Sequence, residues 1–222
     1  MNISYSPSSL SGRFSRMASR FFRLLMGIAV LSTAGLAAAA DEAPDALIKR
    51  ISGEVMQSIK SDPGIQIGDV NKVSALVDSQ IMPNVNFVRM TASAVGRNWR
   101  QATPEQKKRL QDEFKALLVR TYSGALTQVK DQTVSVKPLR AAAADTEVVV
   151  RTEVVGRGDP VQLDYRMEKV GSGWKIYDLN VLGVWMVETY RTQFAQEINA
   201  KGIDGLIAAL AERNKSNAAK KS

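Results

Sequence analysis

The 222-residue sequence contains no cysteine and no histidine, and these two absences narrow the chemistry open to it. Without them there is no Ser-His-Asp or Cys-His catalytic arrangement, no ordinary zinc site and no side chain whose unperturbed pKa lies near neutrality. Disulfides are excluded as well, so a stable fold must depend on an ordinary hydrophobic core. An enzyme of this composition would have to use carboxylates, lysine or tyrosine.

Other signatures of catalytic and binding sites are also missing. The sequence has no Gly-rich phosphate loop, no cluster of metal-ligand residues and no nucleophile elbow, so we expect no cofactor and no metal. Four of the 30 basic side chains and none of the 22 acidic ones lie in the first forty residues, so the rest of the chain carries a net charge of only +4. This modest excess argues against nucleic acid as a partner, which would require a concentrated basic face.

The first forty residues have the pattern of a secretory signal peptide. Four arginines between positions 13 and 23 precede an apolar run from Leu24 to Leu36, and three alanines at 38–40 form a small-residue cleavage site. The run is short for a membrane span. We therefore expect a signal peptide at residues 1–40, one folded domain at residues 41–214 and a basic disordered tail at residues 215–222.

Apolar periodicity predicts helices first and strands later. Apolar residues recur every three or four positions in three segments between 43 and 95, and Thr103-Pro104-Glu105-Gln106 is a capping box that starts a longer helix. Strands are then predicted at residues 133–139, 147–155, 161–170 and 174–181. Because short turns join them, we predict an α+β fold: a helical N-terminal half packed on a curved antiparallel sheet of about four strands, cone-like (NTF2-like), followed by C-terminal helices.

The stretch from Gly173 to Phe194 joins the last predicted strand to a helix. Both alternating sets of positions between 174 and 181 are apolar, so the pattern does not decide which set faces the helices. Helical spacing begins near Val184, so the chain must turn at Leu182-Gly183. Two of the three tryptophans lie in this stretch, a concentration of aromatic residues that suggests the wall of an apolar chamber.

Several segments of the sequence carry a more specific signal. In the helical half these are Gly96-Arg97-Asn98-Trp99-Arg100 and the run from Thr103 to Phe114. In the C-terminal half they are Gly-Trp-Lys-Ile-Tyr-Asp-Leu-Asn-Val-Leu-Gly-Val-Trp at residues 173–185, Tyr190-Arg191-Thr192-Gln193-Phe194 and Gly202-Ile203-Asp204-Gly205-Leu206-Ile207. In this order they resemble the MlaC (toluene-tolerance) family of periplasmic phospholipid shuttle proteins, over nearly the whole mature chain. The common Glu-Gly-Val-Ser joint of the family appears here as Leu182-Gly183-Val184-Trp185.

The resemblance implies a soluble periplasmic carrier and not an enzyme. Such a carrier binds glycerophospholipid acyl chains in an apolar cavity and shuttles lipid between outer-membrane and inner-membrane complexes, which maintains outer-membrane lipid asymmetry. The implied partners are the phospholipid ligand, an inner-membrane ABC transporter complex with a lipid-binding ring and an outer-membrane lipoprotein-porin complex. We expect a monomer that binds no nucleic acid.

We expect the lipid-binding residues at the alternating apolar positions on one face of the sheet and on the apolar faces of the helices that cover it. They are Phe114, Leu118, Tyr122, Val148, Val150, Leu163, Tyr165, Met167, Trp174, Ile176, Tyr177, Leu179, Val184 and Trp185, with the choice between Trp174 and Ile176 or Tyr177 and Leu179 left open. Arg97 and Arg100 are candidates for the mouth, where a headgroup phosphate would lie, and a plain surface role is the alternative.

Two competing hypotheses remain on the sequence alone. One is a cone-fold periplasmic enzyme that acts on an apolar substrate through Asp178 or Asp164, which would require a buried carboxylate of raised pKa facing the cavity. The other is an interaction or chaperone module in which the same aromatic residues form a plain core.

Overall fold

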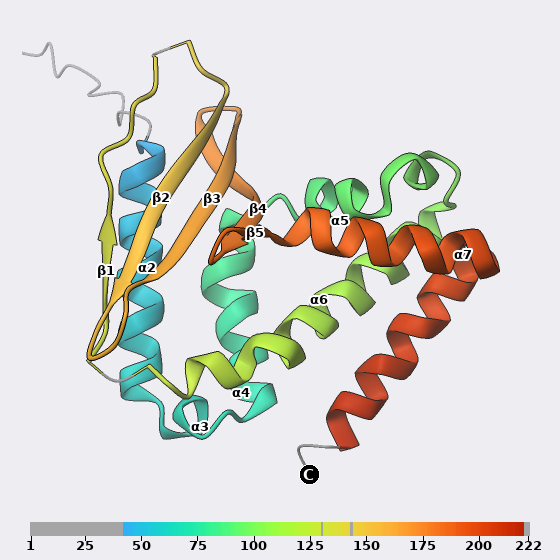
Figure 1. Cartoon of the computed structure of the whole chain (residues 1–222), viewed down its shortest axis with the longest axis horizontal. Coiled ribbons are helices and arrows are strands. Elements are labelled where there is room, and N and C mark those ends of the chain that lie inside the picture. The colour runs from blue at the N-terminus through green and yellow to red at the C-terminus, as the bar shows by residue number, and fades with distance from the viewer. Residues whose placement is uncertain (1–41, 130, 143, 220–222) are drawn as a thin grey trace, which may run out of the picture. The chain divides into compact units, whose positions relative to one another are not determined.

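The computed structural model describes residues 42–129, 131–142 and 144–219, so the predicted signal peptide lies outside the described residues. The chain forms helices, then a sheet, then a long helix, which confirms the α+β prediction (Figure 1). Within these residues, no helix is both long enough and apolar enough to span a membrane. The same residues contain no group of three or more acidic side chains placed to hold a metal ion.

The helical half follows the predicted periodicity closely. Its elements are α2 (Pro44–Ser61), α3 (Pro63–Gln66), α4 (Val70–Leu76), the π-helical turn η1 (Val77–Ile81), the 3-10 turn η2 (Met82–Asn84), α5 (Phe87–Val95), the 3-10 turn η3 (Gly96–Arg100) and α6 (Pro104–Leu126). The Thr103 hydroxyl and the Gln106 side chain form the predicted capping box of α6. Gly96, with φ of 67°, ends α5 as expected.

The sheet has five antiparallel strands in chain order. They are β1 (Thr133–Val136), β2 (Glu147–Val155), β3 (Val161–Val170), β4 (Gly173–Val181) and β5 (Val184–Trp185). The predicted meander is confirmed, with one strand more than expected. Leu182 and Gly183, with φ of 51° and 88°, form the two-residue turn that pairs β5 with the end of β4 before α7 begins.

The C-terminal helix α7 (Met186–Ala219) is longer than predicted. Gly202 interrupts it with φ of 71°, where the sequence suggested a break, but the helix then continues past Leu210 to Ala219. The disordered tail predicted from residue 215 is therefore wrong for residues 215–219, and the last three residues lie outside the described part. Asn214 attaches this extension to α6, since its buried side-chain amide donates to the Glu113 carbonyl oxygen at 3.0 Å and to Glu113 Oε2 at 2.7 Å.

A β-bulge settles which side chains of β4 face the helices. Tyr165 pairs with Leu179, and Met167 pairs with Ile176, so β4 holds one residue more than β3 between these pairs. Paired residues share a face. The side that we call the apolar face carries Val148, Val150, Leu163, Tyr165, Met167, Trp174, Ile176 and Leu179, and the opposite polar face carries Glu147, Arg151, Asp164, Arg166, Glu168, Tyr177 and Asp178.

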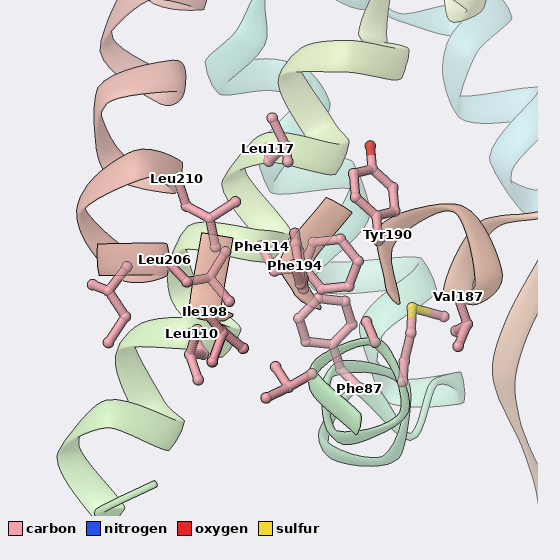
Figure 2. Close-up of a cluster of buried hydrophobic side chains, with 14 residues drawn as sticks. Phe87, Leu110, Phe114, Leu117, Val187, Tyr190, Phe194, Ile198, Leu206 and Leu210 are labelled. Atoms are coloured by element: carbon pink, nitrogen blue, oxygen red, sulfur yellow. The ribbon is translucent and has the colours of Figure 1, made fainter. Parts of the chain in front are cut away.

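Three hydrophobic clusters hold these elements together. The sheet core joins Leu47, Ile48 and Ile51 of α2 to the apolar face. The helical core joins α5, α6 and α7 around Phe114, whose ring centroid lies 4.9 Å from that of Tyr190 and 5.2 Å from that of Phe194 (Figure 2). A third core joins α2, α3, α4 and α6. Val85 packs against both the sheet core and the helical core, and Val55 packs against both the sheet core and the third core, so the three clusters adjoin one another.

Candidate functional site

The apolar face of the sheet is covered unequally. Val148, Val150, Met167 and Ile176 pack in the sheet core and are at most 8% exposed. Leu163, Leu179 and Val181 lie further along the same face, are only half-buried and belong to none of the three cores. We call these three residues the open half of the apolar face. An apolar ligand can gain contact area there without displacing α2.

Polar atoms on the apolar face are paired within the protein. The hydroxyl of Thr152, a residue only 1% exposed, donates to the Leu163 carbonyl oxygen at 2.8 Å. Burial raises the pKa of the Tyr165 phenol, while side-chain hydrogen bonds with Thr152 and Ser52 oppose that rise. Because these groups already have partners, this part of the face presents mainly hydrocarbon.

Helix α6 contributes the three other predicted lining residues from the helical half. Phe114 is 1% exposed at the centre of the helical core, so it reaches a ligand only if the surrounding helices move apart. Leu118 is half-buried against the same core, and Tyr122 is 42% exposed beside Tyr190. Leu118 and Tyr122 are the more accessible candidates on this helix.

Two predicted lining residues, Tyr177 and Trp185, lie away from the apolar face. The Arg89 guanidinium stacks 3.6 Å from the centre of the Tyr177 ring, whose hydroxyl donates to Glu147 Oε2 at 3.1 Å on the polar face. The Trp185 ring, on the side of its pairing partner Asn180, lies 3.8 Å from the Arg166 guanidinium. Val184 instead pairs with Val181, so it lies on the side of the apolar face, where it is 58% exposed. The bulge and the short strand β5 produce these positions, and neither feature follows from alternation in the sequence.

Asp178 has a structural role on the polar face. Its buried Oδ1 accepts hydrogen bonds from the backbone amides of Leu179 at 2.9 Å and Val187 at 3.0 Å, and Oδ2 lies 3.0 Å from Arg166 Nη1. Burial raises the pKa of the carboxyl, while these bonds and Arg166 oppose that rise. The carboxylate points away from the apolar face, so it does not have the geometry that the enzyme hypothesis requires.

Asp164, the other candidate acid, lies on the same polar face. It is 5% exposed, and its Oδ2 accepts a hydrogen bond from Gln162 Nε2 at 2.7 Å. Its Oδ1 is buried without a hydrogen-bond partner among the residues that the structure describes. Like Asp178, this carboxylate does not face the open half of the apolar face.

Arg97 and Arg100 line an open cleft of about 580 Å³. Arg89 and Arg191 lie in the same cleft, together with Ala92, Ser93, Gly96 and Trp99. Arg89 and Arg191 were not predicted for this site, which forms only when α7 brings Arg191 beside the adjoining elements α5 and η3. A headgroup contact by Arg97 and Arg100 stays a prediction.

Comparisons with known proteins agree with the fold and with the resemblance in the sequence. The toluene tolerance protein ttg2D of Pseudomonas putida is 26% identical over 183 residues, which are 82% of this chain and 85% of the relative. The intermembrane phospholipid transport system binding protein MlaC of Haemophilus influenzae is 21% identical over 195 residues, 86% of this chain and 91% of the relative.

A solved structure and a family match extend this agreement. The phospholipid-binding protein of Ralstonia solanacearum, solved in complex with a phospholipid, is 50% identical, with a TM-score of 0.77 over 81% of this chain and 99% of that protein. Family names and this neighbour indicate a binding or transport protein. The family described as MlaC protein matches residues 49–212, so the chain belongs to the MlaC family.

Proposed function

We propose that this protein is a periplasmic carrier that binds a glycerophospholipid by its acyl chains on the apolar face of the sheet. The observation that carries the proposal is the open half of that face, Leu163, Leu179 and Val181, in a fold shared with a 50% identical protein that was solved with a phospholipid. The predicted signal peptide supports export of the chain.

The energetics explain why such a carrier needs a dry surface more than it needs polar chemistry. Burying a methylene contributes about 0.8 kcal/mol, so two acyl chains with about 30 methylenes gain roughly 24 kcal/mol against water. Hydrogen bonds to the tails are not required, and the paired polar groups of Thr152 and Tyr165 do not compete with them. The headgroup can remain in solvent, which allows lipids with different headgroups to bind.

We assign the residues of the pocket by their accessibility. Leu163, Leu179 and Val181 form one wall, and Leu118 and Tyr122 of α6 are the candidates for the facing wall. The buried set Val148, Val150, Met167 and Ile176 forms the floor under α2. Phe114 lies behind the facing wall in the helical core and limits how deep the tails can reach.

Exchange of the lipid must occur in contact with other complexes. The same roughly 24 kcal/mol makes spontaneous release of both tails into water far too slow to be useful. We therefore propose that an inner-membrane ABC transporter complex with a lipid-binding ring and an outer-membrane lipoprotein-porin complex receive and supply the lipid, and that the transport maintains outer-membrane lipid asymmetry. The name of the Haemophilus influenzae relative, an intermembrane phospholipid transport system binding protein, supports this role.

The test is the lipid content of protein purified without detergent. Native mass spectrometry and organic extraction are expected to find about one phospholipid per chain, and delipidated protein is expected to reload from phospholipid vesicles. Protein that is empty after purification and does not reload would overturn the proposal. Release of lysophospholipid or free fatty acid from the vesicles would instead favour the enzyme hypothesis, and we expect none.

A further inference from the structure

The arginine cleft differs in kind from the lipid pocket. Arg89 comes from α5, Arg97 and Arg100 from η3 and Arg191 from α7, and all four face one hollow of about 580 Å³. Arg89 also bonds Glu147 at 2.6 Å and pairs with Glu168, which ties this end of the cleft to the polar face of the sheet. The cleft therefore opens on the side of the sheet opposite to the open half of the apolar face.

The positive charge of the cleft is largely uncompensated. Its lining contains no acidic residue. Within residues 42–129, 131–142 and 144–219, Arg97, Arg100 and Arg191 form no ion pair, and the Nε of Arg191 donates to the Ser93 carbonyl oxygen at 2.9 Å. Gathering like charges in one hollow is unfavourable unless an anion occupies it. This arrangement indicates a binding surface for negative charge.

The shape and the residue types favour a polypeptide. Ala92, Ser93 and Gly96 are the small residues of the lining, and a Cβ added at Gly96 would meet no atom within 4 Å beyond its chain neighbours, so an extended backbone can approach closely. Trp99 adds an apolar wall. Guanidinium groups bind carboxylates in bidentate fashion. A hollow of about 580 Å³ has room for several carboxylates of one peptide segment.

We propose that the arginine cleft is the docking site for an acidic segment of a partner protein, with Arg97, Arg100 and Arg191 binding its carboxylates. The Arg89 side chain positions one end of the site through its contacts with Tyr177 and Glu147. This assignment does not depend on whether the protein carries lipid, and it leaves the lipid pocket free while a partner is bound.

Binding of an acidic peptide tests the proposal. A fluorescein-labelled decapeptide of alternating glutamate and serine is titrated with the full protein at low salt, and its anisotropy is measured. We expect binding that weakens as salt rises, since the attraction is between exposed charges. Arg97→Glu/Arg100→Glu is expected to weaken binding at least tenfold. Arg157→Glu/Lys201→Glu makes the same change in net charge at exposed positions outside the cleft and is expected to change affinity less than twofold.

The remaining outcomes separate other ligands from a peptide. Arg97 and Arg100 are exposed, so folding should survive their replacement, and Arg97→Ala/Arg100→Ala serves as a second variant that adds no negative charge. The proposal is overturned if the peptide does not bind at low salt, if the cleft pair and the control pair lose equal peptide affinity, or if low-millimolar inorganic phosphate displaces the peptide completely. It is also overturned if the cleft variants lose binding to phosphatidylglycerol vesicles but keep binding to the peptide. A loss of bound phospholipid in the cleft variants would assign these arginines to a lipid headgroup instead, whereas unchanged lipid content with lost peptide binding supports docking.

Discussion

The buried carboxylate of Asp178 accepts a hydrogen bond of 3.0 Å from the backbone amide of Val187, nine residues further along the chain. Val187 is the second residue of α7, where backbone amides have no partner within the helix and a negative charge is favourable. The residues between them form the β4–β5 turn. This bond therefore fixes the direction in which α7 leaves the sheet.

Replacing Asp178 is expected to destabilise the fold in proportion to the hydrogen bonds that are lost. Asp178→Ala leaves two amides and Arg166 without this partner and should lower the free energy of unfolding by about 3 kcal/mol. Asp178→Asn keeps an oxygen for the two amides and should cost about half as much. Urea unfolding measures both.

A second acid bound to Arg166 provides the matched control for Asp178. Glu188 lies 3.3 Å from Arg166 Nη1, but its side chain is 60% exposed. Glu188→Ala should therefore change stability by less than about 1 kcal/mol. Equal losses from Asp178→Ala and Glu188→Ala would show that burial of the Asp178 carboxylate is not what makes it important.

Neighbouring residues of β3 test the assignment of the lipid pocket. Leu163 lies in the open half of the apolar face, and Gln162 points to the opposite side of the same strand. Leu163→Arg should abolish retention of phospholipid through purification, because a guanidinium would replace hydrocarbon contact. Gln162→Arg should retain it. Extraction and phosphate assay quantify the lipid, and circular dichroism checks folding.

Two outcomes for Leu163→Arg would count against the pocket. Retention of lipid by this variant, or equal loss in both variants, would contradict the pocket assignment. Met167→Arg is a poor substitute, since Met167 is fully buried in the sheet core and an arginine there should unfold the protein.

Much of the architecture could be predicted because local patterns decide it. The ends of β2 and β3 coincide with the predicted strands, since alternation runs through each strand and turn residues follow it. The start of α6 was predicted from its capping box, whose hydrogen bonds are local. For these elements the information lies within a few residues of each boundary.

The features that escaped prediction depend on contacts between distant segments. Residues 174–181 are apolar at both parities, so only the pairing with β3 reveals the bulge that turns Tyr177 to the polar face. The last part of α7 is attached to α6 by Asn214, which bonds Glu113, 101 residues earlier in the chain. The arginine cleft likewise requires α5, η3 and α7 to be in place. Periodicity cannot report such contacts.

Leu182 offers a test of strain at the turn between β4 and β5. It is 65% exposed and has φ of 51°, a left-handed conformation that costs a leucine roughly 1–2 kcal/mol. Leu182→Asn places the preferred Asn-Gly pair in the two-residue turn and should raise the free energy of unfolding by about 0.5–1 kcal/mol.

Thermal and urea unfolding measure the effect at Leu182, and Leu182→Ala is the control. Alanine removes the exposed side chain but retains the unfavourable backbone conformation, so it should not stabilise the protein. Stabilisation by alanine equal to that by asparagine would attribute the gain to loss of the exposed leucine side chain and not to relief of strain. Unchanged phospholipid content in both variants is expected, because Leu182 lies outside the pocket residues.

The buried phenol of Tyr190 should make the protein less stable at alkaline pH. Its ring packs in the helical core, and burial, with a smaller contribution from Tyr122, raises the pKa of its phenol to about 12. The unfolded chain would release this proton near pH 10, so between about pH 10 and 12 the unfolded state binds fewer protons and the free energy of unfolding falls, by about 3 kcal/mol for this group. Tyr190→Phe has no phenol to titrate at this position. As pH rises from about 10 to 12, the free energy of unfolding should therefore fall further for the wild type than for the variant. Urea unfolding at a series of pH values measures it, and a pH-independent difference would contradict burial of a titrating phenol at this site.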